Sequence, residues 1–362
     1  MSVFKHDYSA VDRFVHRMGF HGVLVTAALA DIEDVVFAKK LRQIEVQRPV
    51  FVTSLPRCGT TTLLQILCDT GSFAAHSYAD MPFVLCPLLW HHITRRFRRT
   101  DLTRERAHGD GVLVNFDSPE SFEEIVWRAF WPAMYSDKSI RVWTPEQSDG
   151  AFAEFFLNHI RKVILLRRRS AAPVRYVSKN NVNIARLGLI ASLFPDCTVI
   201  VPFRNPLDQC LSLLRQHENF CALHEQDEFA RQYMHYVGHR EFGKVLTPID
   251  FQGWLSSCSN SGSRQLKFWI QYWCAAFDHV LRNRPTNLVL IDYDRLCSQP
   301  RLSLLALAER LQLRDRQAVP RLVERIRLAR SHAEKNVAHL GDLDAGALHT
   351  YRELQSLALN RN

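Results

Sequence analysis

The chain has 362 residues, of which 47% are hydrophobic, 23% charged and 10% aromatic. This composition is typical of an ordinary globular protein, and it excludes the disordered, collagen-like and low-complexity classes. With 46 lysines and arginines against 37 acidic residues, the formal charge of +9 favours anionic partners such as phosphate or sulfate esters, polyanions or membrane surfaces. Nucleic acid is a minor hypothesis, because the basic clusters at His91–Arg106 and Arg314–Arg330 lack the interleaved aromatic residues of a single-strand binding groove.

The nine cysteines indicate neither a zinc site nor a disulfide framework, because their number is odd and no two of them form a CxxC pair. No run reaches the ~18 apolar residues that a membrane span needs. The first residues also lack the uninterrupted apolar core of a signal peptide. We therefore expect no transmembrane segment and a reducing, cytoplasmic setting.

The first part of the chain predicts a helix, a strand, a loop and a second helix. Apolar residues recur at helical spacing over Tyr8–Gln43, and the first strand signal follows at Pro49–Thr53. The strand gives way to a loop at Ser54–Gly59. Thr60–Thr70 then has a helical period and stops at Gly71, a residue suited to the position after a helix.

Three more apolar runs predict strands, and helical patterns follow them. These runs are Val174–Ser178, Thr198–Val201 and Leu288–Ile291. After the second of them, Asn205 can cap a helix and Pro206 can occupy its first turn. Because strands alternate with helices, the sequence predicts an α/β fold with a central parallel sheet.

The loop after the first strand has the features of a phosphate cradle. Between a strand and a helix, backbone N–H groups and the helix dipole favour an anion, and Arg57 adds a cation. A Walker-type loop follows the pattern GxxxxGK[ST], but Thr60 stands after Gly59 where the lysine would be. The residues therefore indicate either a phosphate loop of another type or a core helix that threonine merely caps.

The segment Pro56–Leu63 resembles the 5′-phosphosulfate loop of sulfotransferases that use 3′-phosphoadenosine 5′-phosphosulfate (PAPS), with Cys58 where that family usually has serine. A second segment, Val201–Asp208 followed by Ser212, is similar to the family's 3′-phosphate motif. Arg204 ends a predicted strand and Ser212 lies two helical turns further on, so a guanidinium and a hydroxyl can meet on one phosphate monoester. The chain thus resembles the P-loop-like sulfotransferases of the bacterial type.

This resemblance implies a three-layer, P-loop-like α/β fold with helical insertions, PAPS as the sulfuryl donor and a hydroxyl-bearing acceptor. The residues expected to bind the donor are Arg57, Cys58, Gly59, Thr60, Thr61, Thr62, Arg204 and Ser212. No repeat or long linker divides the chain, so we expect one sulfotransferase domain over 1–362. Its parts are an N-terminal helical segment (1–48), the nucleotide-binding core (49–216) and a remainder (217–362), with insertions at Pro82–Asp110 and Gln216–Leu266.

Sulfuryl transfer needs a base for the proton of the acceptor. The resemblance points to Asp80, which stands where the Golgi tyrosylprotein sulfotransferases and several bacterial relatives have a carboxylate. His108, with Asp110 nearby, is the runner-up, because soluble members of the family use a histidine. Three acidic residues that equally suit the start of a helix remain possible bases: Glu120, Glu123 and Glu124.

Two basic residues are expected to stabilise the charge that develops during the transfer, Arg57 and Lys179, and no metal is expected. Lys179 ends a predicted strand, and the resemblance places a lysine there near the leaving group. Two other functions stay open: a P-loop kinase that uses ATP and magnesium, and a non-enzymatic protein that binds polyanions. The acceptor could be a carbohydrate, a lipid or a small molecule, since the insertions that would shape its pocket carry no readable motif.

Overall fold

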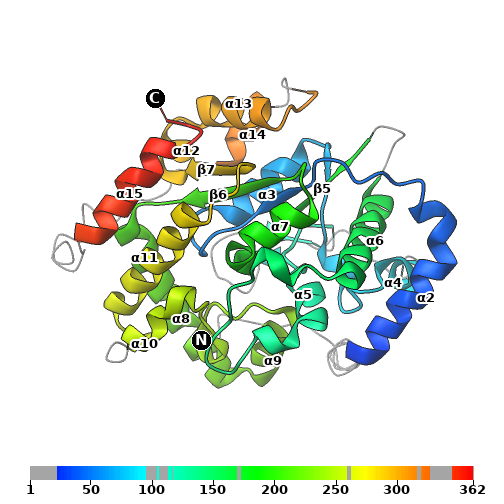
Figure 1. Ribbon diagram of the computed structural model, residues 1–362, viewed down its shortest axis with the longest axis horizontal. Helices are drawn as coiled ribbons and strands as arrows, with labels where there is room; N and C mark the ends of the chain where they lie inside the picture. The colour runs from blue at the N-terminus through cyan, green and yellow to red at the C-terminus, as the bar shows by residue number, and fades with distance from the viewer. Residues whose placement is uncertain are drawn as a thin grey trace.

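Five parallel strands form the central sheet, in the order β2-β5-β1-β6-β7 (Figure 1). Their bounds are β1 Val50–Val52, β2 Phe73–Ala74, β5 Arg175–Lys179, β6 Thr198–Phe203 and β7 Leu288–Asp292. The computed structural model describes residues 23–94, 104–105, 113–115, 117–168, 173–258, 262–315, 319–326 and 345–361. The four strands predicted from apolar runs are confirmed. Strand β2 is not predicted from the sequence, because two residues are too few to show the alternation of a strand.

Helices cover both faces of the sheet (Figure 1). One face carries α3 (Thr60–Asp69), α12 (Tyr293–Ser298), α13 (Pro300–Arg310) and α14 (Val319–Leu322). The other face carries α6 (Gly150–Arg167), α7 (Leu187–Leu193), α8 (Pro206–Gln226), α11 (Leu266–Arg282) and α15 (Ala345–Leu357). Further from the sheet lie α2 (Val23–Leu41), α4 (Pro87–Thr94), α5 (Glu124–Phe130), α9 (Glu228–Val237), α10 (Trp254–Ser257) and the antiparallel ribbon of β3 (Arg104–Glu105) and β4 (Leu113–Val114). The predicted three-layer α/β fold is confirmed.

The strands hold these layers together because successive residues face opposite sides of the sheet. Val50 and Val52 belong to the hydrophobic core on the α3 and α13 side. Phe51 belongs to the core on the other side, where its ring lies 6.4 Å from that of Phe156 in α6. All three residues of β1 are buried, as is typical of a central strand in a parallel sheet.

Helix α8 begins as predicted and extends into the expected insertion. The Asn205 side chain accepts hydrogen bonds from the backbone N–H groups of Leu207 and Asp208, and Pro206 is the first helical residue. The helix continues to Gln226, because Phe220 and Leu223 extend its buried face. The insertion expected from residue 216 onward therefore starts inside a helix. The insertion expected at 82–110 contains α4 and β3, and much of it lies outside the described residues.

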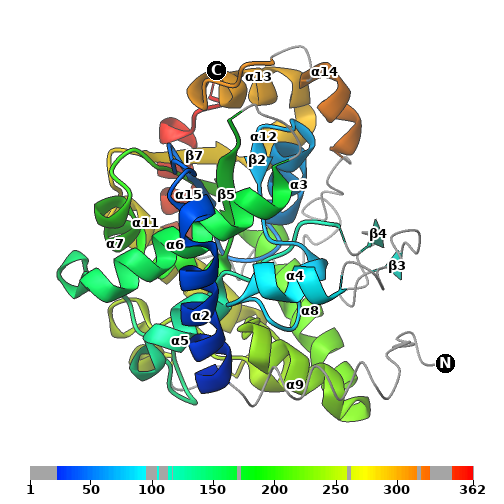
Figure 2. The ribbon, with the colours of Figure 1, turned by 90° about the vertical axis from the view of Figure 1, so that its right-hand side faces the viewer.

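The N-terminal helical prediction is confirmed by α2 for the described residues, and positions 8–22 lie outside them. Figure 2 shows α2 crossing the outer side of α6. Lys162 of α6 is fully buried, and its Nζ lies 3.0 Å from a carboxylate oxygen of Glu33 and 2.6 Å from one of Asp34, both on α2. These ion pairs fix the position of α2, since separating them would leave charges buried without a partner.

Candidate functional site

The loop after β1 lies at the carboxyl edge of the sheet, beside the end of β6. Arg57 and Gly59 both have left-handed backbones there, with φ angles of 70° and 85°. A Cβ atom on Gly59 would lie only 1.9 Å from the ring of Tyr293, the first residue of α12. Position 59 therefore requires glycine for two reasons, the positive φ and the approach of the tyrosine ring.

The loop leads directly into α3, whose first turn is formed by Thr60, Thr61 and Thr62. Gly59 stands at the N-cap position, and no side chain in the described part of the chain caps this turn. The first N–H groups of a helix have no partner within the helix, and the helix dipole makes that end favourable for an anion. The start of α3 can therefore donate backbone hydrogen bonds to a phosphate or sulfate group.

Helix α8 holds the loop in place through Gln209. The side-chain amide of this residue donates to the backbone carbonyls of Pro56 at 2.9 Å and Leu55 at 3.3 Å. The indole N–H of Trp273 in turn donates to Gln209 Oε1 at 3.0 Å. Because Gln209 is fully buried, these bonds couple the loop rigidly to the helix that follows β6.

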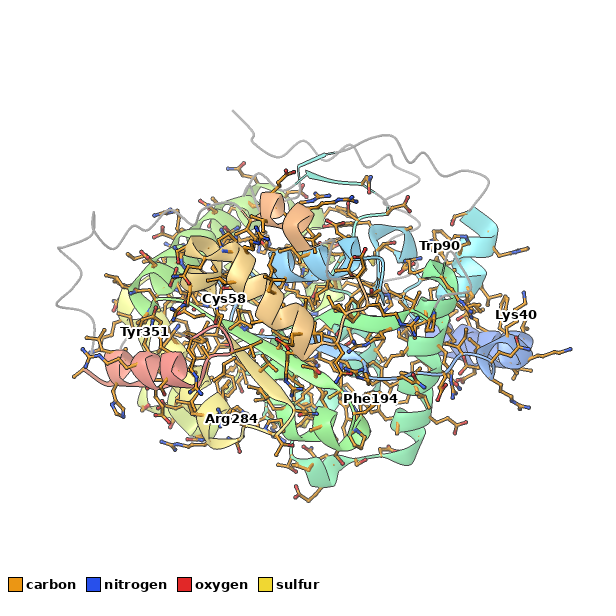
Figure 3. The ribbon with its side chains drawn as sticks, turned by 90° about the horizontal axis from the view of Figure 1, so that it is seen from above. Lys40, Cys58, Trp90, Phe194, Arg284 and Tyr351 are labelled. Carbon is orange, nitrogen blue, oxygen red and sulfur yellow. The ribbon has the colours of Figure 1, made fainter. Side chains whose placement is uncertain are left out.

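The side chain of Cys58 faces the interior. Figure 3 places it within the body of the protein, whereas Lys40 lies at the periphery. Its thiol is fully buried and donates to the backbone carbonyl of Leu55 at 2.9 Å. Burial raises the pKa of Cys58 to about 11, so the thiol stays protonated at neutral pH. The contribution of this residue to an anion site would come from its backbone.

The two segments that suggested a nucleotide site meet at this edge. Arg57 Nε donates to the hydroxyl oxygen of Ser212 at 3.1 Å, although the two residues lie 155 positions apart. Arg57 belongs to the loop after β1, and Ser212 lies on α8 after the neighbouring strand β6. The parallel pairing of these strands puts both of their carboxyl ends at the same edge, which explains the contact.

Arg204 directly follows β6 and is buried, with a guanidinium held by carboxylates. Its Nε donates to Asp294 Oδ1 at 3.2 Å, and its Nη2 lies 3.6 Å from Asp208 Oδ2. Asp294 also accepts the backbone N–H of Asn205 at 2.7 Å. Burial raises the pKa of Asp294, although the Asn205 N–H and the Arg204 charge stabilise its anion. The guanidinium is thus oriented beside the start of α8, between two acidic residues.

Lys179 is the last residue of β5 and is buried at the same edge of the sheet. It lies opposite Val52 of β1 in the register of the two strands. Its charge acts on the Cys58 thiol, which places its ammonium group near the loop. The hydroxyl of Ser121 donates to its backbone carbonyl at 2.6 Å, so the segment around residue 121 lies there too.

Asp80 lies in a short 3-10 helix, η1 (Tyr78–Asp80), and is almost fully buried. Arg167 Nη2 lies 2.5 and 2.6 Å from its two oxygens, the Ser77 N–H donates to it at 3.0 Å, and His76 Nδ1 lies 3.1 Å away. Burial alone would raise the pKa of Asp80, but the Arg167 charge and the His76 contacts outweigh burial and hold this pKa well below its usual range. A carboxylate stabilised this strongly has a low affinity for a further proton.

Glu123 and Glu124 are buried at the start of α5, and each is held by several side chains. Glu123 accepts hydrogen bonds from Trp127, Tyr176 and Asn183. Glu124 accepts hydrogen bonds from Tyr135, Asn180 and Arg186. These contacts occupy both oxygens of each carboxylate, so the two residues fasten α5 to the segment that follows Lys179.

Glu120 has a different setting from the other carboxylates. Its oxygens accept hydrogen bonds from the Tyr78 hydroxyl and from the Ser121 backbone N–H, the latter at 2.8 Å. Both of these donors are neutral, and Ser121 is the residue that bonds to the Lys179 carbonyl. The remaining candidate bases, His108 and Asp110, lie outside the described residues.

Several residues that shape this site have no signal in the sequence. Gln209 and Tyr293 contact the loop from other elements, and Arg167 reaches Asp80 from the end of α6. Only the position of Tyr293 in the sequence could have indicated a role. It comes directly after β7, at the sheet edge where ligands bind in open α/β folds. An exposed helical glutamine or arginine would show the same local pattern.

Two features are absent from the described residues. These residues contain no group of three or more His, Cys, Asp or Glu side chains placed to hold a metal ion. Of the helices that the structure describes, none has both the length and the apolar composition that crossing a membrane requires. All nine cysteines are free thiols.

Comparison with known proteins places this chain in a family. A family model described as "Sulfotransferase family" matches residues 49–244, more than half of the chain. Among solved structures, the chain is similar to the sulfotransferase STF1 from Mycobacterium tuberculosis H37Rv, with 14% identity, a TM-score of 0.51, and coverage of 97% of this chain and 94% of that one. It is also similar to the sulfotransferase STF9 from Mycobacterium avium, with 14% identity, a TM-score of 0.45, and coverage of 98% and 96%. A search of the curated proteins gives no match. The match over the loop, β6 and α8 shows that the chain belongs to the sulfotransferase family.

Proposed function

We propose that this sulfotransferase takes the sulfuryl group from PAPS and transfers it to a hydroxyl group of an acceptor. The observation that supports this best is the 3.1 Å hydrogen bond between Arg57 and Ser212. It joins the segment similar to the family's 5′-phosphosulfate loop with the segment similar to its 3′-phosphate motif. A donor that carries both a phosphosulfate and a 3′-phosphate needs two anion sites at a fixed separation, and these segments supply them side by side.

The residues at both places suit these groups. The backbone from Gly59 to Thr62 begins α3 and would bind the 5′-phosphosulfate. The Ser212 hydroxyl accepts a hydrogen bond from Arg57, so its own proton is left to donate to a 3′-phosphate. Arg204 would supply the positive charge that attracts the 3′-phosphate. This charge is needed because two nearby carboxylates, Asp208 and Asp294, would otherwise repel a phosphate.

Calorimetric titration with adenosine 3′,5′-bisphosphate tests the donor site directly. We expect saturable binding without metal, weakened at least about tenfold in Arg204→Ala and about fivefold or more in Ser212→Ala. Arg215→Ala is the matched control, because Arg215 lies on the same helix and is exposed. Preference for ATP with magnesium would instead support a P-loop kinase. Absence of any saturable nucleotide binding, with salt-dependent binding to heparin, would support a polyanion-binding protein.

In the transfer, the acceptor oxygen forms a bond to sulfur while the bond between sulfur and the 5′-phosphate oxygen breaks. The acceptor loses its proton to a base, and adenosine 3′,5′-bisphosphate leaves. Negative charge develops on the leaving oxygen, so cations at that point stabilise the transition state. Lys179 and Arg57 are proposed for this role, since both lie at the carboxyl edge of the sheet beside the loop.

For the base, we propose Glu120 in preference to Asp80, the residue that the family resemblance indicates. The Asp80 anion is stabilised by the guanidinium of Arg167, whereas Glu120 directly precedes Ser121, whose hydroxyl donates to the Lys179 carbonyl. Hydrogen bonds from charged donors are roughly twice as strong as those from neutral donors. The carboxylate of Asp80 therefore has a low affinity for the proton of an acceptor, and Glu120 is a buried carboxylate next to the segment that contacts Lys179.

Two amide variants distinguish the candidates, with the best acceptor from a screen of hydroxyl compounds as substrate. Glu120→Gln is expected to lower kcat by about 100-fold or more while leaving the affinity for adenosine 3′,5′-bisphosphate unchanged. Asp80→Asn is expected to lower the stability, because Arg167 loses its anionic partner, while kcat per folded molecule stays near normal. The opposite pattern would assign the proton transfer to Asp80.

A further inference from the structure

A pocket adjoins the loop that is proposed to bind the donor. Its walls come from the first residues of that loop, from the start of the 3-10 helix η4 (Asn181–Ala185) and from the segment 240–249. The space between its lining atoms, with the open mouth and adjoining solvent included, is about 330 Å³. The loop residues in its wall directly precede Arg57, and η4 begins two residues after Lys179. The pocket therefore lies next to the proposed place of transfer.

Most of the wall is apolar, and its two charged residues are Arg240 and Glu241. Leu55, Ile140, Val182 and Ile249 all line the pocket and belong to the buried core of the protein. A site with this lining favours an apolar ligand body. An oligosaccharide would place many hydroxyl groups against this wall, where they have no hydrogen-bond partners. Each hydroxyl buried in this way would cost binding free energy.

Asn181 contributes a hydrogen-bond acceptor that no described residue uses. Only 7% of this residue is exposed, and its Nδ2 donates to Glu241 Oε1 at 2.7 Å. Its Oδ1 is buried and has no hydrogen-bond partner among the described residues. Its backbone carbonyl accepts from the Thr53 hydroxyl at 3.3 Å, which fixes it beside the start of the donor loop. A buried polar atom without a partner is uncommon and indicates a place for a ligand donor such as a hydroxyl.

Arg240 contributes a buried cation with one donor that no described residue accepts. It is 8% exposed, one of its Nη atoms lies 3.2 Å from His235 Nε2, and its guanidinium lies 6.0 Å from the centroid of the Tyr135 ring. Its Nε is buried and has no hydrogen-bond partner among the described residues. Burial and the charge of Arg128 lower the pKa of Arg240, so an anion beside it would stabilise its charged form.

We infer that this pocket binds the acceptor, and that the acceptor is a compact hydroxy acid in which an aromatic or alicyclic ring separates a hydroxyl from an anionic group. The anion pairs with Arg240, the ring contacts the apolar wall, and Asn181 accepts a hydrogen bond from the hydroxyl that is to be modified. The inference rests on the proposed function. The transfer itself is the one described above, with the new bond between the acceptor oxygen and sulfur and the proton passing to Glu120.

The test is calorimetric titration of the protein, loaded with adenosine 3′,5′-bisphosphate, with 4-hydroxyphenylacetate. The matched neutral probe is 4-hydroxyphenylacetamide, and cellobiose represents carbohydrates. We expect the acid to bind at least about tenfold more tightly than the amide, and cellobiose not to bind. Arg240→Met should abolish the preference for the acid, and Arg240→Lys should retain part of it. Arg231→Met, an exposed arginine on the neighbouring helix α9, is the control that should keep the full preference.

A second variant distinguishes loss of acid binding from loss of folding. Leu246→Trp fills the pocket from the segment 240–249 and should remove binding of the acid while the nucleotide still binds. The inference is overturned if acid and amide bind equally, if Arg240→Met leaves the preference unchanged, if the sugar binds best, or if no probe binds below about 10 mM. Failure of the donor proposal is recognised separately, because the wild-type protein would then not bind the bisphosphate. The acid titrated into the unloaded protein would still test the pocket.

Discussion

Arg186→Met is expected to lower the free energy of unfolding by about 3–5 kcal/mol, because it breaks a fully buried ion pair. Arg186 is 0% exposed, and its two Nη atoms donate to the two oxygens of Glu124 at 2.7 and 2.9 Å. The guanidinium also lies 4.4 Å from the ring centroid of Trp127 and 4.1 Å from that of Trp143. Methionine preserves an apolar side chain of similar length but leaves the Glu124 carboxylate buried without its cation.

Urea unfolding followed by tryptophan fluorescence measures this loss. With an m-value of about 3 kcal/mol/M, a loss of about 4 kcal/mol moves the midpoint by roughly 1.3 M. Arg231→Met is the matched control, since its ion pair with Glu228 has side chains 44% and 56% exposed. Exposed pairs contribute little, so the control should leave the midpoint unchanged.

A double variant separates the lost charge pair from lost packing. In Glu124→Gln/Arg186→Met neither charge remains, so this protein should be more stable than Arg186→Met alone, by about 1–3 kcal/mol. The amide can still accept a hydrogen bond from Asn180. The reasoning is refuted if Arg186→Met costs less than about 1 kcal/mol, or if the double variant loses the sum of the two single losses.

Two further predictions concern the donor loop and acid stability. Gly59→Ala should weaken binding of adenosine 3′,5′-bisphosphate at least about tenfold, because its Cβ would collide with Tyr293. Gly71→Ala is the control, because φ is also positive there but nothing lies within 4 Å of the added Cβ. It should lower the free energy of unfolding by only about 1–2 kcal/mol in a thermal melt and leave nucleotide binding intact. Equal effects of the two variants on binding would contradict the predicted collision with Tyr293. His217 and His224 accept backbone N–H groups of the segment 243–244 through Nδ1, each at 3.1 Å, and burial lowers the pKa of both to about 4 from 6.5. The stability that these neutral rings contribute is complete above about pH 6.5 and is lost as the pH falls towards 4. Urea midpoints should therefore drop over that range, and less steeply in His217→Gln/His224→Gln. Identical slopes in the two proteins would contradict the role of these histidines in acid stability.

The features that could be predicted from the sequence are those with local signals. The strand β6 is an apolar run, and Asn205 with Pro206 marks the start of the next helix by cap geometry alone. The meeting of Arg57 with Ser212 also follows from the sequence, because two parallel strands that each precede a motif bring both motifs to one edge. Local patterns thus predict the fold and the approximate place of the proposed donor site.

Contacts between distant segments could not be predicted. Asp80 has the chain position of a base, but Arg167, 87 residues away, changes its protonation chemistry. Asn181 and Arg240 likewise come together only when η4 packs against the segment 240–249. A side chain's partner depends on tertiary packing, which periodicity and cap signals do not encode. The proposed acid-base and acceptor residues are therefore the part of the site that required the structure.

The carboxylates around Arg204 lead to a last prediction, that nucleotide binding is coupled to proton uptake at Asp294. Burial already raises the pKa of this residue, and Arg204 Nε lies 3.2 Å from its Oδ1. A phosphate bound at Arg204 would raise that pKa further, because like charges disfavour ionisation. The complex then holds more protons than the free protein, so affinity for adenosine 3′,5′-bisphosphate should increase as the pH falls. The phosphate itself titrates near pH 6, but equally in all variants. Calorimetry in buffers of different ionisation enthalpy should therefore show that proton uptake on nucleotide binding is larger in the wild type than in Asp294→Asn. Equal uptake in the two proteins would show that Arg204 binds no phosphate beside this carboxylate.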